Sequence, residues 1–230
     1  MTSIRLWDLP LRAFHWLLVI AVCGSLVSIK LGGEWMVWHE RFGLAAVGLL
    51  SFRLIWGFIG STYARFSVFL PGPGDLKSYI QGKWQGAGHN PLGALSVLAM
   101  IALFGFQAVT GLFANDEISF NGPLYPLISS DLSDTLSGWH RQSEWFLYGL
   151  VALHIGAVMF YTLVRKNNLI KPMVTGKKSI SDHLGRSAEG GGIGAFVAAF
   201  CLSAVLVGLA SGEFIPPPPA PEPAPQDLGW

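Results

Sequence analysis

Two histidines, His140 and His154, lie fourteen residues apart in an apolar stretch of the chain. Fourteen residues make close to four turns of an α-helix, so both imidazoles project from nearly the same face of one helix. A rise of about 1.5 Å per residue separates them by about 21 Å along the helix axis. Neutral imidazole is the commonest metal ligand among side chains. The spacing therefore predicts one helix that supplies a ligand to each of two separate sites.

The composition predicts that this helix lies in a membrane. The chain has 230 residues, of which 51% are hydrophobic and only 13% are charged. Soluble domains carry about 25% charged residues, so a bilayer is the natural place for so much apolar surface. A hydrocarbon core about 30 Å thick leaves room for one site near each surface along the same helix.

Five apolar stretches are long enough to span a bilayer, which takes about 20 apolar residues per helix. They cover approximately residues 11–29, 38–59, 91–113, 138–164 and 192–210. The sequence therefore predicts an all-α integral membrane fold, a four-helix bundle with an additional fifth transmembrane helix. The expected parts of the chain are a four-helix domain over 1–170, a loop over 171–190, the fifth helix over 191–212 and a proline-rich tail over 213–230.

Basic residues concentrate in alternate loops. Arg5 and Arg12 precede the first stretch, and six Lys or Arg residues follow the fourth stretch, whereas residues 114–137 contain none. Cytoplasmic loops carry the excess of Lys and Arg in membrane proteins. The pattern predicts a cytoplasmic N-terminus, a cytoplasmic 171–190 loop and a C-terminal tail on the opposite side.

Two further histidines complete two pairs at matching depths. His15 lies near the cytoplasmic start of the first stretch, and His39 opens the second stretch on the outer side. His39 therefore pairs with His140 at the outer level, and His15 pairs with His154 at the inner level. Helix bundles hold haem b iron between two such axial imidazoles, within apolar walls. The four histidines predict two haem b groups, each with two histidine ligands to iron.

Other interpretations of the histidines remain open for each residue alone. A single histidine in a membrane helix can hydrogen-bond to a neighbouring helix, but four in two depth-matched pairs rarely arise by chance. Zinc would need a third or fourth ligand at each depth, and the sequence offers no obvious Cys, Asp or Glu. His89 and His183 lie in the cytoplasmic loops and match neither depth. His89 could cap a helix or line a quinone pocket.

Four arginines lie where haem propionates would need cationic partners. Arg41 and Arg141 lie close to the two outer histidines, and Arg12 lies one helical turn before the inner histidine of the first stretch. Arg53 lies deeper in the second stretch, at the inner level. The alternative for each arginine is that its guanidinium extends to the membrane interface.

Five segments resemble one known family, in order along the chain. They are WDLPLRAFHW, HERFGL, FRLIWGFIGS, GHNPLGALSVL with a following TGLF, and WHRQSEWFLYGLVALHIGAV. Over residues 3–170 the chain resembles bacterial cytochrome b561 and the b-type cytochrome subunit of nickel–iron hydrogenases. The resemblance implies a four-helix core that binds two b haems through the four paired histidines, in the bacterial inner membrane. The fifth helix and the tail, which would be periplasmic, are not part of the usual core.

The resemblance implies electron exchange between the quinone pool, with quinone or quinol as substrate, and a partner redox protein. The first hypothesis is a periplasmic partner such as a c-type cytochrome, attracted by the acidic residues of the 114–137 loop. The loop would also be acidic if Lys and Arg were merely excluded from it. A second hypothesis is a membrane anchor and electron-transfer subunit of a hydrogenase or other dehydrogenase complex.

A third hypothesis is a superoxide:quinone oxidoreductase, and a non-redox membrane scaffold is the remaining alternative. The tail is either an extended end of the chain or a tether for a periplasmic partner. A homodimer is compatible with the sequence. No nucleic-acid partner is expected.

Overall fold

The computed structural model describes residues 2–181 and 185–216. His183 and residues 217–230, which make up most of the predicted proline-rich tail, lie outside the described residues. Within the described part, five helices are long and apolar enough to cross a membrane. They are α1 (Leu9–Leu31), α2 (Met36–Ile59), α5 (Pro91–Leu112), α6 (Ser130–Met159) and α8 (Ile193–Ala210). The prediction of five spanning helices is confirmed.

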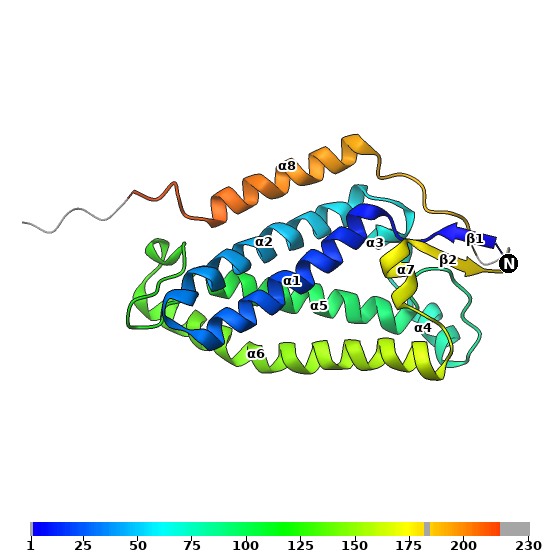
Figure 1. The fold of residues 1–230 in the computed structure, drawn as a ribbon, viewed down its shortest axis with the longest axis horizontal. Coiled ribbons are helices and arrows are strands. Elements are labelled where there is room, and N and C mark those ends of the chain that lie inside the picture. The colour runs from blue at the N-terminus through cyan, green and yellow to red at the C-terminus, as the bar shows by residue number, and fades with distance from the viewer. Residues whose placement is uncertain (1, 182–184, 217–230) are drawn as a thin grey trace, which may run out of the picture.

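Helices α1, α2, α5 and α6 form an elongated bundle, and α8 runs beside α2 on its outside (Figure 1). The N-terminus and the C-terminal end of α8 lie at opposite ends of the bundle (Figure 1). We call the end that carries the N-terminal strand the sheet end, and the end that carries the loop over residues 113–129 the loop end. The sequence predicts that the sheet end is cytoplasmic.

Capping residues explain where the long helices begin. Asp8 accepts a hydrogen bond from the backbone N–H of Leu11 at the start of α1, and Asn90 accepts one from Gly93 at the start of α5. Ser129 caps α6, which starts earlier than the apolar stretch predicts. Hydropathy detects only the part of a helix that lies in the bilayer, so it does not detect the polar first turns of α6.

The sheet end carries structure that the all-α prediction did not include. Strands β1 (Thr2–Arg5) and β2 (Lys177–Ile180) pair antiparallel. They bring the N-terminus against the segment that follows α6, for which the sequence predicts only a loop. The shorter helices are α3 (Phe66–Phe69), α4 (Pro73–Ile80) and α7 (Ile170–Thr175), with 3₁₀ turns at Gly33–Trp35, Thr62–Ala64 and Tyr125–Leu127 and a π-helical turn at Phe160–Val164.

The best-buried hydrophobic cluster lies at the sheet end. Trp56 of α2 is fully buried and stacks on Phe52, and Phe196 of α8 contacts both rings. Further along the same two helices, a Cβ on Gly48 would lie 2.8 Å from Val207, so glycine permits their close approach. Helix α8 is therefore packed against the bundle and is not separated from it.

Asp8 connects α1 to this cluster, which gives a stability prediction. Its second carboxylate oxygen accepts a hydrogen bond of 2.9 Å from the indole N–H of Trp56. Asp8→Ala should lower the free energy of unfolding by about 2–4 kcal/mol, since it removes a cap and leaves a buried N–H unpaired. Asn90→Ala, which removes a cap alone, should cost about 1 kcal/mol. Unfolding of both variants in detergent measures the difference, and equal losses would contradict it.

Candidate haem sites

The loop-end pair consists of His39 on α2 and His140 on α6. Their ring centroids lie 6.1 Å apart, with the two planes at 90°. Two imidazoles on opposite sides of one metal, with metal–nitrogen bonds of about 2 Å, have nitrogens about 4 Å apart and ring centres about 6 Å apart. The observed separation therefore fits two rings that would both bind one iron.

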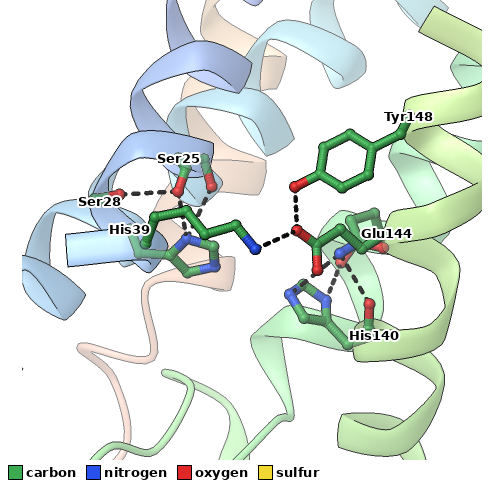
Figure 2. Close-up of polar contacts among 8 residues, drawn as sticks. Ser25, Ser28, His39, His140, Glu144 and Tyr148 are labelled. Carbon is green, nitrogen blue, oxygen red and sulfur yellow. Dashed lines mark hydrogen bonds and ion pairs between the residues drawn. The ribbon is translucent and has the colours of Figure 1, made fainter. Parts of the chain in front are cut away.

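Both rings of this pair are oriented by backbone carbonyl groups. Nδ1 of His39 lies 2.9 Å from the carbonyl oxygen of Ser25 (Figure 2). Nδ1 of His140 lies 2.9 Å from the carbonyl oxygen of Gln107. A carbonyl oxygen only accepts hydrogen bonds, so each Nδ1 carries the hydrogen and each Nε2 keeps its lone pair. Metal-ligating histidines commonly show this arrangement, which fixes the ring and raises its basicity.

A cavity of about 260 Å³ lies between the four bundle helices at this pair. Most of its wall is apolar, and it includes Phe42, Leu44, Phe104, Ala108 and Leu147. Gly43 also lines it, and a Cβ built there meets no atom within 4 Å, so the space beside this backbone is open. The Nε2 of His140 lies 3.3 Å from the amide nitrogen of Gln107, which would have to turn away for a metal to bind there. An apolar space between facing helices, beside two imidazoles, is a suitable setting for a porphyrin.

Gly111 of α5 sets the position of the His140 ring. A Cβ at residue 111 would lie 2.8 Å from Cε1 and 3.2 Å from Nδ1 of that ring. Gly111→Ala should therefore displace the imidazole and weaken cofactor binding at the loop end by about 1–3 kcal/mol, or about 5- to 150-fold. Gly105→Ala on the same helix meets no neighbour within 4 Å and is the matched control. Competition of each variant with an external haem acceptor measures the effect, and equal retention would contradict it.

Polar residues that sequence reasoning missed surround the loop-end cavity. Glu144, one turn after His140, accepts a hydrogen bond from the hydroxyl of Tyr148 (Figure 2). It also accepts one of 3.3 Å from Lys30. Gln107 holds His140 from α5, through its carbonyl and through its amide, which donates to the His140 carbonyl at 3.1 Å. The sequence could have indicated these residues, because strongly polar residues inside apolar stretches are functional candidates.

The sheet-end pair consists of His15 on α1 and His154 on α6. His15 lies in the second turn of α1, which begins at the sheet end, and His154 lies near the sheet-end terminus of α6. Nδ1 of His15 is buried without a hydrogen-bond partner within the described residues. The two pairs thus differ, because among the described residues only the loop-end histidines have backbone acceptors for their ring N–H groups.

The four arginines fall into different surroundings. Arg41 packs over the ring of Trp38 at 4.9 Å, and Arg141 lines the loop-end cavity. Arg12 donates to the carbonyl of Val174, while its Nε is buried without a partner in the described chain. Arg12 and Arg53 lie toward the sheet end, and the other two lie toward the loop end.

Arg53 is the buried arginine of the four, with 2% of its surface exposed. Neither Nη atom has a hydrogen-bond partner among the described residues, and the guanidinium lies over Phe66 at 4.9 Å and Phe69 at 5.6 Å. A cation over an aromatic ring gains about 2 kcal/mol when desolvated, whereas burying an unpaired ion costs several kcal/mol. The rings therefore do not replace a hydrogen-bonded anionic partner, and the Asp8 carboxylate, which acts on Arg53 electrostatically, forms no hydrogen bond with it.

His89 does not cap α5, because Asn90 does so. Its ring lies between Trp7 at 4.6 Å and Phe69 at 5.0 Å, and it lines a cavity of about 220 Å³ at the sheet end. Burial, and secondarily the nearby Arg53 guanidinium, lower the pKa of His89 to about 3. The imidazole is therefore neutral at physiological pH. Of the two roles considered for His89, the structure excludes the cap of α5, and lining a quinone pocket stays a prediction.

The apolar helices and paired histidines are those of a multi-pass membrane cytochrome. The chain belongs to the prokaryotic cytochrome b561 family, whose sequence profile matches residues 6–176. It is accordingly a b-type cytochrome of membrane electron transport, with haem b as its cofactor. The resemblance seen in the sequence is confirmed. Helix α8 lies beyond the matched residues.

Curated relatives named "Probable Ni/Fe-hydrogenase B-type cytochrome subunit" resemble this chain over most of their length. The protein of Azotobacter chroococcum mcd 1 is 26% identical, covering 79% of this chain and 90% of the relative. That of Rhodobacter capsulatus is 20% identical, covering 79% and 83%. The "Probable Ni/Fe-hydrogenase 1 B-type cytochrome subunit" of Escherichia coli (strain K12) is 22% identical, covering 75% and 89%. No solved structure gives a significant match.

Proposed function

We propose that the chain binds two b haems and carries electrons between the quinone pool and a hydrogenase-type partner. The observation that carries this proposal is the placement of two histidine pairs toward opposite ends of one bundle, with α6 contributing a histidine to each. At about 1.5 Å per residue, His140 and His154 span about 21 Å of a hydrocarbon core about 30 Å thick.

Haem b, when bound, supplies one-electron exchange at its iron. The protein residues hold it and tune it. His39 and His140 would ligate the loop-end iron, and His15 and His154 the sheet-end iron, while the apolar walls exclude water. Arg41 and Arg141 are the proposed propionate partners at the loop end. Arg12 and Arg53 take that role at the sheet end.

The charge distribution supports an orientation in the bacterial inner membrane. Lys and Arg residues concentrate around the start of α1, between α2 and α5, and after α6, all at the sheet end. The positive-inside rule then makes the sheet end cytoplasmic and the loop end periplasmic. The four-helix part over residues 1–170 would hold both haems, and the α8 region would add a fifth crossing that ends in a periplasmic tail.

A hydrogenase-type partner is supported by the names of the relatives, which this chain matches over 83–90% of their length. The acidic loop over residues 114–137 gives weaker support to a c-type cytochrome as the partner. Asp116 accepts hydrogen bonds from the backbone of Ile118, Ser119 and Phe120, which lower its pKa, and Asp134 accepts one from Asn115. Two of the four carboxylates in this loop therefore accept hydrogen bonds from their own part of the chain.

Purification of the full chain from haem-sufficient membranes tests this function. We expect low-spin b-type absorption bands, two haems per chain, and co-purification of an iron–sulfur subunit of a hydrogenase. Hydrogen should then reduce the haems in native membranes, and an added quinone analogue should reoxidise them. A preparation without haem would exclude the cytochrome role. Reduction by hydrogen in membranes that lack any hydrogenase would exclude the proposed partner.

A further inference from the structure

Buried polar atoms without a hydrogen-bond partner gather at one end of the molecule. In the part of the chain that the structure describes they are Arg12 Nε, His15 Nδ1, Arg53 Nη1 and Nη2, Ser61 Oγ, Arg65 Nε and His89 Nδ1. All of these residues belong to the sheet end. Most of these atoms are nitrogens of cationic or imidazole groups, and buried polar groups in folded proteins almost always have a partner. An anionic ligand with several acceptor oxygens fits such a surrounding.

Arg53 and His89 form the centre of this group. Both lie against the ring of Phe69, the guanidinium at 5.6 Å and the imidazole at 5.0 Å from its centroid. Trp56, one turn after Arg53 on α2, donates a hydrogen bond to Asp8 at the start of α1. The ring of His89 packs against Trp7, the residue before Asp8. Both groups therefore lie beside the first turns of α1, the helix that carries His15.

The fold fixes His89 in this position from three sides. Its ring lies between the aromatic rings of Trp7 and Phe69. Lys178 of β2 donates a hydrogen bond of 3.2 Å to the carbonyl of Ala87, two residues before it, and Asn90 caps α5 directly after it. The β1–β2 sheet thus holds the loop that carries His89. A neutral imidazole held in this way offers one N–H donor without adding a charge.

We propose that Arg53 and His89 together bind a propionate carboxylate of the haem held between His15 and His154, Arg53 by its charge and His89 by its ring N–H. The propionates are the carboxylates that haem b carries, and they need donors where the dielectric is low. His89 is then a cofactor-binding residue that the four-histidine assignment did not include. The proposal rests on the proposed function, because it requires a haem at the sheet end.

Redox titration of the purified full-length protein, followed in the visible bands, tests the proposal. An uncompensated carboxylate near the iron disfavours the added electron. Arg53→Gln should therefore lower the reduction equilibrium constant of the sheet-end haem about tenfold, or about 59 mV for one electron. His89→Leu should lower it in the same direction by less, and the double variant should show a non-additive effect since both groups share one carboxylate. The loss of one component in His15→Leu identifies the sheet-end haem.

Three controls separate this proposal from its alternatives. Lys77→Gln removes an exposed cation of α4 at the same end and should shift neither haem. Arg53→Lys and His89→Gln keep a donor and should stay close to the unmodified protein, so they report even where the stronger variants fail to fold. Protein reconstituted with the dimethyl ester of haem lacks the carboxylates and should lose the effect of both substitutions.

The outcomes separate a failure of the propionate assignment from a failure of the proposed function. Unchanged potentials in Arg53→Gln and His89→Leu, with both haems bound, would overturn the propionate assignment. Shifts that persist with the dimethyl ester would assign the site to a free anion instead. A preparation of the unmodified protein with no sheet-end haem would reject the proposed function itself.

Discussion

Replacing His140 with leucine should remove the loop-end haem and leave the sheet-end haem in place. The haem-to-protein ratio should fall by half, since leucine fills a similar volume but offers no lone pair to the iron. His39→Leu should give the same result, because the two rings lie 6.1 Å apart and would share one iron. Pyridine haemochrome analysis of the purified variants measures the ratio, and redox titration shows which component is lost.

Trp139→Leu is the matched control for this prediction. Trp139 precedes His140 on α6, and half of its surface is exposed, so its removal should leave both haems bound. Retention of both haems in His140→Leu and in His39→Leu would reject this histidine pair as the ligand set. Loss of both haems together with the folded protein would instead show that the loop-end cofactor is needed for assembly. Thermal unfolding of each variant separates these two results.

The sequence predicted the helices and the depth of each histidine because both depend on local patterns. Hydropathy marks the part of a helix that lies in the bilayer, and the helical repeat fixes which residues share a face. These two rules were enough to place His140 and His154 on one face and to match each with a histidine of an earlier helix.

The surroundings of the histidines could not be predicted in the same way. The acceptors for His39 and His140 are the main-chain carbonyls of Ser25 and Gln107. Every residue has a main-chain carbonyl, so no residue type in the sequence indicates these acceptors. The β1–β2 sheet joins residues more than 170 positions apart, and its four-residue strands carry little periodicity. The indole of Trp56 meets Asp8 only when α1 and α2 are packed. Each of these features depends on which segments meet in space.

The two histidine pairs differ in the hydrogen bonds of their ring N–H groups. This difference would affect the direction of electron flow between them. A ring N–H donated to a carbonyl makes the imidazole a stronger donor to the metal and favours the oxidised iron. The loop-end pair has this arrangement on both rings. At the sheet end, Nδ1 of His15 has no hydrogen-bond partner within the described residues. For the two haems proposed above, this difference would favour electron movement from the loop end toward the sheet end.

Electron transfer across the bilayer should depend on the sheet-end pair. His154→Leu should abolish transfer through the protein while leaving the loop-end haem reducible from its own side. Without the sheet-end haem, an electron at the depth of His140 must cross the remaining distance, about 21 Å to the depth of His154, in one step. Electron tunnelling falls steeply with distance, so a single step of this length is too slow to replace two shorter ones.

Proteoliposomes that contain ferricyanide, with a membrane-impermeant reductant added outside, measure this transfer. The unmodified protein should reduce the internal ferricyanide, and His154→Leu should fall to the rate of protein-free vesicles. Leu153→Ala, a substitution at an exposed neighbour on α6, should keep the full rate. Transfer at an unchanged rate in both His154→Leu and His15→Leu would mean that electrons do not pass through a haem at the sheet end. The path across the membrane would then have to be sought outside the two histidine pairs.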